Sequence, residues 1–289
     1  MKLQPITKDY IWGGTRLPDE YGIGDGNVAE AWMCSFVAGN ESLVDGEPIT
    51  KKFTREKWGS ACVAFSEFPV LVKLIDANKD LSVQVHPTDD YAITHGQAYG
   101  KTEMWYIVDA TPDAYIYLGF NRDVTEKECR GAIDEGTFTD LLRKQPVKKG
   151  ESYFVPAGTV HAIGAGCLIA EVQQSSDCTF RVYDYNRLGA DGKPRQLHVE
   201  QALEVMQYSK YVPQRFTGCL AACPSFTVWA VGEDEDENPF SYTSLLIVDG
   251  EGTLNGEKVK KGDSFLFAAG ERYELKGKVK AIKANTMGR

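Results

Sequence analysis

Two of the four histidines in this chain stand where a metal ion could be bound. Gln84 and His86 are two residues apart in an alternating segment, so on a β-strand their side chains point to the same side. Glu103 follows on the next expected strand, and His161 ends a glycine-proline-glycine segment that begins at Gly150. One amide, two imidazoles and one carboxylate form a donor set that suits zinc, although Mn, Fe, Co or Ni could also occupy it.

Each of these residues has a simpler interpretation when it is taken alone. His86 could be a hydrogen-bonded core residue, Gln84 by itself carries little information, and Glu103 could simply pair with Lys101. It is their joint spacing with the glycine-proline-glycine-histidine segment that favours a shared site. Four protein ligands with room for a water or a sugar oxygen would form a Lewis-acid centre.

Short strands are the elements that would position these residues. The segment 81–86 alternates strictly between apolar and polar side chains, which predicts a half-buried strand. Similar segments, rich in aromatic and β-branched residues, cover 103–108, 115–120, 151–155, 180–185, 226–231 and 242–248. Strands at such short intervals, without alternating helices, predict a mainly β sandwich or barrel and argue against a doubly wound α/β fold.

Helices are expected to be few and short. Thr125 can cap a helix that runs through Ile133 and ends at Gly136, and Thr137 can start another that Pro146 would stop. The apolar residues of 196–207 recur with the spacing of a surface helix, whose first turn contains His198 and gives it a structural role.

An internal repeat suggests that the chain contains two copies of one β architecture. Residues 148–161 align without gaps to residues 260–273, with six of fourteen positions identical. The second copy has Tyr273 where the first has His161. We therefore expect a metal-binding N-terminal domain, 1–208, and a C-terminal domain without metal ligands, 215–289. The acidic run 233–237 is expected to be a solvated loop.

Composition narrows the possible functions. The 289 residues carry a net charge of −9, which argues against a nucleic-acid surface. The longest apolar stretch, 68–75, is interrupted by Lys73 and is too short to span a membrane. The N-terminus shows no apolar run, so we expect no secretory signal. Seven cysteines without a framework spacing favour reduced thiols and a cytoplasmic location.

Several separated motifs resemble type I phosphomannose isomerases, a family within the cupin superfamily. They are, in chain order, Trp12-Gly-Gly, Glu30-Ala-Trp, Gln84-Val-His-Pro, Gly100-Lys-Thr-Glu-Met, Pro156-Ala-Gly-Thr-Val-His-Ala and Gln174-Ser-Ser-Asp leading to Arg181. A typical cupin has His-x-His followed by Glu in its first motif, and here Gln84 replaces the first histidine. The resemblance is closest to the short bacterial form and implies two cupin-type (jelly-roll) β domains with a few short helices.

The resemblance also implies an activity and a site. It implies one Zn²⁺ per chain, held by Gln84, His86, Glu103 and His161, in an isomerase that interconverts mannose 6-phosphate and fructose 6-phosphate through a cis-enediol(ate). We expect a monomer or homodimer whose partner is a small sugar phosphate, with no nucleic acid or membrane.

The catalytic side chains implied by the resemblance are Arg181, Lys101 and Glu171. Each also has a structural interpretation. Arg181 could form a surface salt bridge with Asp177 or Asp184, Lys101 could be solvated, and Glu171 could be a structural acid.

Other functions remain open at this stage. An iron or manganese cupin oxygenase, an isomerase of another sugar, and a non-enzymatic sugar-binding cupin would share much of the pattern. Glutamine in the place of the first histidine argues against the usual oxygenase ligand set. An intact ligand set beside Arg181 argues against a protein that only binds sugar.

Overall fold

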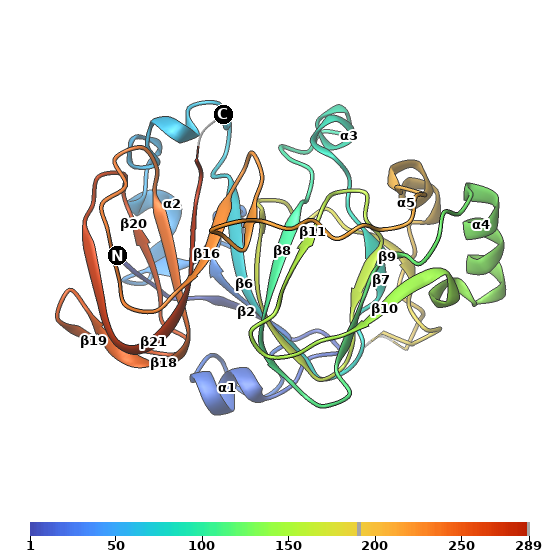
Figure 1. The fold of residues 1–289 in the computed structure, drawn as a ribbon, viewed down its shortest axis with the longest axis horizontal. Helices are drawn as coiled ribbons and strands as arrows, with labels where there is room; N and C mark the ends of the chain where they lie inside the picture. The colour runs from blue at the N-terminus through green and yellow to red at the C-terminus, as the bar shows by residue number, and fades with distance from the viewer. Residues whose placement is uncertain (190–191, 288–289) are drawn as a thin grey trace.

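The fold places one β-sheet in the middle of the molecule, between two others. The structure is a computed structural model that describes residues 1–189 and 192–287. The central sheet has six antiparallel strands (Figure 1). In pairing order they are β11 (Ser152–Val155), β8 (Glu103–Ala110), β13 (Cys167–Gln174), β6 (Val70–Ala77), β3 (Glu30–Cys34) and β2 (Ile6–Lys8). This architecture confirms the mainly β prediction.

A second sheet, of five strands, covers one face of the central sheet. Its strands pair in the order β10 (Leu142–Pro146), β9 (Tyr115–Phe120), β12 (His161–Ile163), β7 (Val83–Val85) and β14 (Phe180–Tyr183). Apolar residues of both sheets share a buried cluster that includes Trp105, Ile107 and Ile169 on one side and Ile116 and Ile163 on the other. The two sheets therefore enclose a common interior, and the candidate site lies in it.

The third sheet is built from the C-terminal part of the chain and covers the other face of the central sheet (Figure 1). Its strands are β1 (Lys2–Leu3), β15 (Ala221–Ala222), β16 (Thr227–Val231), β17 (Asp234–Asp236), β18 (Thr243–Leu254), β19 (Glu257–Lys260), β20 (Ser264–Phe267) and β21 (Tyr273–Asn285). Because β1 pairs with β20, the N-terminus completes this sheet. The division into domains 1–208 and 215–289 stays a prediction.

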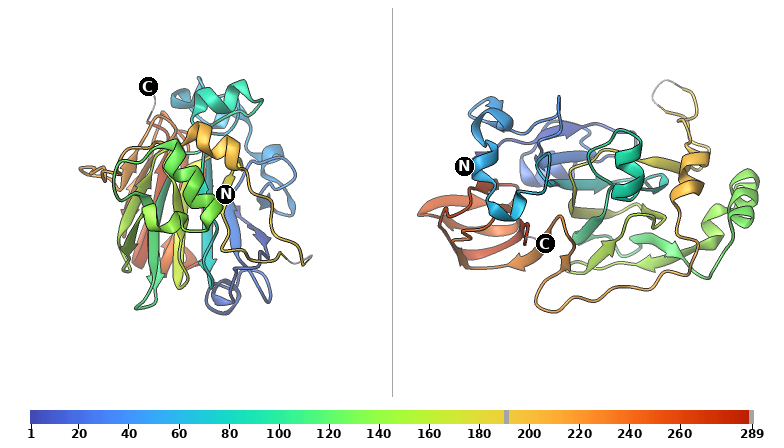
Figure 2. Two further views of the ribbon diagram at one scale, coloured as in Figure 1. Left: turned by 90° about the vertical axis from the view of Figure 1, so that its right-hand side faces the viewer. Right: turned by 90° about the horizontal axis from the view of Figure 1, so that it is seen from above.

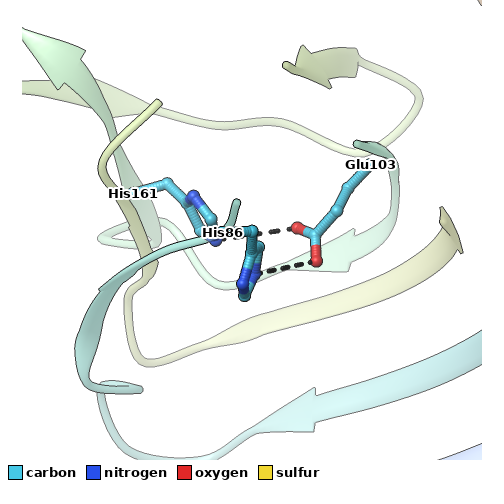
Figure 3. A group of neighbouring side chains, drawn as sticks. All are labelled: His86, Glu103 and His161. Carbon is cyan, nitrogen blue, oxygen red and sulfur yellow. Dashed lines mark ion pairs between the residues drawn. The ribbon is translucent and has the colours of Figure 1, made fainter. Parts of the chain in front are cut away.

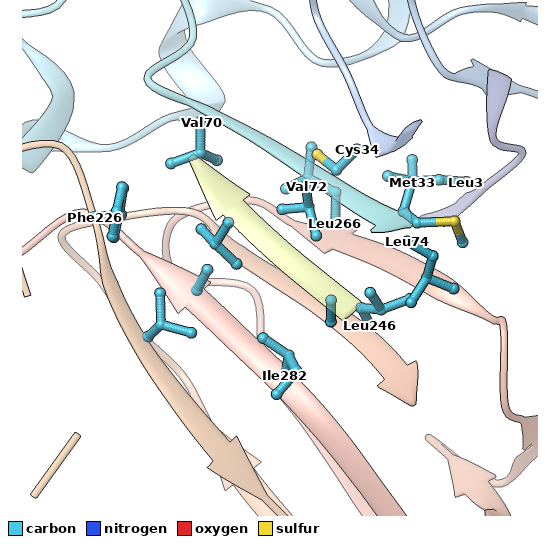
Figure 4. Close-up of a cluster of buried hydrophobic side chains, with 14 of the residues drawn as sticks. Leu3, Met33, Cys34, Val70, Val72, Leu74, Phe226, Leu246, Leu266 and Ile282 are labelled. Carbon is cyan, nitrogen blue, oxygen red and sulfur yellow. The ribbon is translucent and has the colours of Figure 1, made fainter. Parts of the chain in front are cut away.

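Successive side chains of the central strands point alternately toward the C-terminal sheet and toward the five-stranded sheet. Val70, Val72 and Leu74 of β6 pack against Leu246 and Ile282 of the C-terminal sheet in one buried apolar cluster (Figure 4). The intervening residue Lys73 points the other way, into the interior shared with the five-stranded sheet. All eight residues of β6 are buried, as expected for a strand that is covered on both faces.

In the described part of the chain, five short α-helices lie around these sheets. They are α1 (Arg16–Tyr21), α2 (Ile49–Lys52), α3 (Asp89–Thr94), α4 (Glu126–Glu135) and α5 (Val199–Val205). The capping prediction for α4 is confirmed, because Thr125 and Glu128 form a capping box and Gly136 ends the helix in a left-handed conformation. Figure 2 shows α4 beside α5 at the end of the molecule farthest from the C-terminal sheet.

Two local predictions were wrong, and pairing with neighbouring strands explains both. The helix expected after Thr137 is only a 3-10 turn, Phe138–Leu141, after which the chain becomes β10 and pairs with β9. The acidic run 233–237 is not a free loop. Residues 234–236 form β17 against β21, and Asp234 accepts hydrogen bonds from Tyr273 and Lys283. Tertiary partners override weak local preferences in both places.

The described residues also bear on the predictions about membrane-spanning segments and about the cysteines. Among them, no helix combines the length and the apolar character needed to cross a membrane. All seven cysteines are free thiols.

A small hairpin and two 3-10 turns lie between β3 and β6 in the chain. The strands β4 (Leu43–Val44) and β5 (Glu47–Pro48) pair with each other, and 3-10 turns cover Arg55–Lys57 and Ser60–Cys62. This part of the chain contributes Phe53 and Trp58 to the core beneath the C-terminal sheet.

Candidate metal centre

The predicted ligands come from both sheets and meet between them. His161 opens β12 and is the cross-strand partner of Gln84 in β7, and Gln84 is also paired with Arg181 of β14. His86 directly follows β7. Glu103 opens β8 of the central sheet and projects toward the two histidines (Figure 3). Strand pairing on one sheet and a single acid from the other thus bring residues 77 positions apart into one cluster.

The cluster is compact and almost fully buried. Nε2 of His86 lies 3.2 Å from one carboxylate oxygen of Glu103, and Nε2 of His161 lies 3.6 Å from the other. The possible ligand atoms of these three residues all lie within 4.8 Å of one another. The side-chain amide of Gln84 lies 3.4 Å from His161 Nε2, so it can turn its oxygen toward the same point.

The hydrogen bonds of the imidazoles fit a metal centre. Nδ1 of His86 lies 3.0 Å from the carbonyl oxygen of Cys178, and Nδ1 of His161 lies 2.8 Å from that of Thr159. A carbonyl can only accept, so each Nδ1 carries the proton and each Nε2 presents a lone pair toward Glu103. A backbone acceptor behind the ring is the usual support of a metal-binding histidine. The donor set therefore fits a divalent cation.

Burial and charge keep this cluster in the protonation state that a cation requires. Burial and the nearby Lys101 lower the pKa of His86 to about 3, and burial lowers the pKa of His161. Burial alone would raise the pKa of the Glu103 carboxyl, but Lys101 and the two histidines hold it well below its usual range. Two neutral imidazoles thus face an ionised carboxylate.

Lys101 lies inside this arrangement and also lines the adjoining cavity. Its ammonium donates to His86 Nε2 at 3.0 Å and forms an ion pair with Glu103. Lys101 is therefore not the solvated lysine of the alternative interpretation, because it is only 4% exposed. In this position it balances the charge of the Glu103 carboxylate.

A cavity of about 320 Å³ opens beside the cluster. Gln84 and Lys101 connect it to the buried histidines, and apolar surface comes from Trp12, Leu81 and Ile163. Its polar wall is formed by Lys8, Tyr10, Glu30, Trp32, Asn40, Lys73, Ser82, Glu171, Asp177, Thr179, Arg181 and Arg195, with Ile75 between them. The size and the mixture of surfaces suit a small polar ligand such as a sugar phosphate.

A row of paired residues crosses the central sheet beneath this cavity. In strand register, Trp32 of β3 lies opposite Lys73 of β6, which lies opposite Glu171 of β13, which lies opposite Trp105 of β8. Lys73 Nζ lies 3.4 Å from carboxylate oxygens of both Glu171 and Glu30. Trp105 Nε1 donates to Glu171 at 2.8 Å and lies 3.2 Å from Glu103. Glu171 is thereby linked to the metal centre.

The charges in this row depend on one another. Burial and the negative charge of Glu103 raise the pKa of Glu171 above its ordinary value, while Lys73 opposes that shift. Burial would lower the pKa of Lys73, but Glu30 and Glu171 outweigh it and raise that pKa. The buried lysine therefore stays charged between two acids.

Arg181 faces the cavity instead of pairing with a nearby acid. Its Nε donates to Ser82 Oγ at 3.3 Å, and its Nη1 donates to the carbonyl of Gln196 at 2.8 Å. Asp184, one of the acids expected to hold it, is instead bound by Arg187 and Arg195. The backbone N–H of Arg181 donates to Nδ1 of His198 at 3.2 Å, which gives His198 the structural role that the helix pattern predicted.

Several residues that line the cavity were not predicted from the sequence, among them Glu30 as an acid, Lys73 and Arg195. Lys73 carried one signal, since a lysine inside an apolar strand needs a buried partner. Arg195 carried none, because it lies in an irregular segment between β14 and α5. His95, by contrast, is exposed and stacks on Tyr91, outside the cavity.

Comparisons with known proteins place this arrangement in a family. Residues 1–129 match the family model of the type I phosphomannose isomerase catalytic domain. The chain is 38% identical to mannose-6-phosphate isomerase ManA of Bacillus subtilis, over 96% of each chain. It is 37% identical to mannose-6-phosphate isomerase of Streptococcus mutans, over 91% of this chain and 90% of the relative.

Solved structures agree with the sequence relatives. The crystal structure of mannose 6-phosphate isomerase from Bacillus subtilis superposes with a TM-score of 0.86 and 32% identity, covering 98% of each chain. A putative mannosephosphate isomerase from Archaeoglobus fulgidus shares the fold at a TM-score of 0.79 and 22% identity, covering 99% of this chain and 96% of that one. These matches confirm the predicted cupin-type architecture. Fold, motifs and relatives together show that the chain belongs to the type I phosphomannose isomerase (mannose-6-phosphate isomerase) family of enzymes.

Proposed function

We propose that this protein is a metal-dependent aldose–ketose isomerase that interconverts mannose 6-phosphate and fructose 6-phosphate through a cis-enediol(ate). The observation that carries the proposal is the buried His86–Glu103–His161 cluster beside a cavity that Arg181 also lines. A cation centre next to a fixed guanidinium suits a reaction in which negative charge develops on adjacent sugar oxygens. The relatives named mannose-6-phosphate isomerases support mannose 6-phosphate as a substrate.

In this proposal the metal is one Zn²⁺ per chain, held by Gln84, His86, Glu103 and His161. When bound, the ion polarises the sugar carbonyl and stabilises the charge that develops on its oxygen. The Nδ1–H groups of His86 and His161 donate to backbone carbonyls, which fixes the orientation of the two rings for metal binding. Lys101, which balances Glu103 here, lines the cavity and can carry its ammonium there.

Two side chains of this chain are suited to moving the proton between carbons 1 and 2. Lys101 reaches both the metal cluster and the cavity. Glu171 lines the same cavity, and Trp105 and Lys73 fix its carboxylate from two sides. A positioned group of this kind contributes about 10²–10⁴-fold to the rate. Arg181 remains protonated and donates only, so its role is to hold negative charge and not to transfer a proton.

A coupled assay tests this function directly. Formation of fructose 6-phosphate from mannose 6-phosphate is measured with the protein as purified, after chelation, and after Zn²⁺ is restored. We expect activity that chelation abolishes and zinc restores, and no activity on glucose 6-phosphate as the matched substrate control. Full activity in metal-free protein would contradict the metal dependence. Binding of the sugar phosphate without turnover would contradict the isomerase assignment.

We further propose that the protein acts in the cytoplasm on a small sugar phosphate, without a nucleic-acid partner, as a monomer or homodimer. The net charge of −9 supports the exclusion of nucleic acid, and the free cysteines suit a reducing compartment. Size-exclusion chromatography with light scattering distinguishes the two oligomeric states.

A further inference from the structure

The cations of the cavity are not balanced equally. Lys73 lies between Glu30 and Glu171, and Lys101 pairs with Glu103, so these lysines have carboxylate partners. Arg181 donates to a hydroxyl and a backbone carbonyl, and no described carboxylate forms an ion pair with it. Lys8 donates to the side-chain oxygen of Asn40 and likewise has no ion-paired carboxylate among the described residues, so Lys8 and Arg181 carry charges in this cavity that no direct partner balances.

A second guanidinium adds to this imbalance. Arg195 also lines the cavity, and it is held by Asp184 through Nε at 2.7 Å and Nη2 at 2.6 Å. The same carboxylate is shared with Arg187, whose Nη2 lies 2.5 Å from it. Two guanidiniums on one carboxylate leave one positive charge without compensation. Asp177 stands on the same wall but is exposed to solvent, where its field is screened.

Arg195 is held rigidly. Asp184 is buried, at 5% exposure, and binds the Arg195 fork in a bidentate manner. Arg187 anchors the same carboxylate to the barrel, because its Nη1 donates 2.5 Å to the carbonyl of Asp80. Asp184 engages two of the five N–H donors of the Arg195 guanidinium, which leaves others for a ligand.

The place of this charge relative to the metal centre fits a phosphorylated sugar. Ser82 and the predicted ligands Gln84 and His86 are spaced two residues apart at β7, so their side chains share one face. The Arg181 guanidinium donates a hydrogen bond to Ser82. Two residues along a strand span about 6.6 Å, so the guanidinium lies beyond Gln84 at one end of the cavity. Arg195 lies next to this guanidinium, because Arg181 also donates to the carbonyl of Gln196, the residue that follows Arg195 in the chain. The reacting carbons of a hexose 6-phosphate lie at the opposite end from its phosphate.

We propose that Arg195, oriented by Asp184, binds the phosphate of the sugar phosphate and thereby determines specificity for phosphorylated sugars. The inference rests on the proposed function for the identity of the substrate. The planar fork of arginine matches phosphate oxygens, and its positive charge opposes the charge of the dianion. Arg195 is a binding residue here, since it contacts the end of the substrate that does not react.

The test compares Arg195→Gln with the matched variant Arg130→Gln. Arg130 is exposed on α4 and bonds Glu200 and Glu126, so its substitution removes the same charge far from the cavity contacts. For Arg195→Gln we expect KM for mannose 6-phosphate to rise about 10- to 100-fold, as for loss of a charge-assisted contact, while kcat changes little. Calorimetric Kd values for inorganic phosphate should rise in parallel, and Arg130→Gln should leave both constants unchanged.

The two measurements separate this inference from the proposed function. A folded Arg195→Gln variant with unchanged KM and unchanged phosphate Kd would overturn the inference even if the wild-type protein is a good isomerase. A wild-type protein without isomerase activity would overturn the function, whereas phosphate binding that depends on Arg195 would still support the inference. If Arg195→Gln does not fold, Arg195→Lys gives the same readout, with an expected rise in KM because a point charge does not reproduce the fork.

Discussion

Residues 148–161 and residues 260–273 have nearly the same backbone and very different chemistry. The third residue of each is a glycine in the left-handed region, Gly150 at φ 92° and Gly262 at φ 91°. Each segment turns again at a second glycine, Gly158 at φ 84° and Gly270 at φ 79°. Between the turns lie β11 and β20, four residues each. Even the turn hydrogen bond recurs, since Glu151 accepts from the N–H of Lys148 and Asp263 from that of Lys260. The two segments therefore share the geometry of their turns and strands.

The difference lies in the side chains that follow these turns. The first copy delivers His161 to a cluster with Glu103, and the strand register places Glu103 opposite Val155. In the second copy the equivalent of Val155 is Phe267, and the residue opposite it is Thr243. The imidazole and the carboxylate are thus both replaced.

The second interior is closed by aromatic packing. Tyr273 stacks on Phe267 at 4.6 Å between ring centroids and donates to Asp234. No histidine follows His198 in the chain. The same strand and turn geometry can therefore place a side chain at an equivalent position without giving it the same function. We propose that the first copy carries the chemistry, whereas the C-terminal sheet packs against the central sheet in a shared apolar cluster.

Replacing His161 should have the largest effect. His161→Ala removes a neutral imidazole that no other described residue can supply at that point. Losses behind the ligands already cost about 10–100-fold in metal affinity or activity, so a lost ligand should cost at least as much. We expect isomerase activity to fall below detection in a coupled assay, together with loss of bound metal. Near-normal turnover would remove His161 from the centre.

Arg181→Ala should have the next largest effect, and it acts without disturbing the metal. We expect turnover to fall on the order of 10²–10³-fold, the range for one preorganised donor, with metal content and melting temperature unchanged. Arg181→Lys should recover little of it. Steady-state kinetics are the readout. A higher KM with unchanged turnover would assign Arg181 to the phosphate alone.

A substitution in the other region should change stability and leave chemistry intact. Leu246→Ala opens a hole in the fully buried apolar cluster between the C-terminal and central sheets. Such losses cost about 2–5 kcal/mol of unfolding free energy, which urea denaturation measures. Metal content should not change. Val212→Ala, at a position that is 74% exposed, is the matched control and should have almost no effect.

Tyr273→Phe should have the smallest effect. It changes the residue of the second copy that is equivalent to His161, where we expect no catalytic role. It removes the hydroxyl that donates to Asp234, while Lys283 still pairs with that carboxylate. We expect about 1 kcal/mol of destabilisation and full isomerase activity. A large loss of activity would show that the second copy contributes chemistry after all.

The proximity of His86, Glu103 and His161 was easier to predict from the sequence than the rest of the cavity, for a physical reason. Gln84 and His86 share a face because strand side chains alternate, and His161 was marked by its glycine-proline-glycine turn. The row through Lys73 and Glu171 joins strands that are nearly a hundred residues apart, so only their pairing reveals it. Local patterns carry no such long-range register.

The same reason explains the wrong local predictions. The segment after Thr137 and the acidic run 233–237 both contain acceptable signals for a helix and a loop, yet each becomes a strand because a neighbouring strand offers backbone partners. Arg195 gave no signal, since its position depends on a single buried carboxylate, Asp184, in an irregular segment.

We expect the first copy of the repeat to bind one divalent ion and the second to bind none. Elemental analysis of the purified wild-type protein and of His86→Ala measures this directly. We expect about one equivalent of tightly bound divalent metal per chain in the wild type, as for a single site of this donor set, and none in the variant. Two tight equivalents in the wild type, or an equivalent retained in His86→Ala, would contradict it.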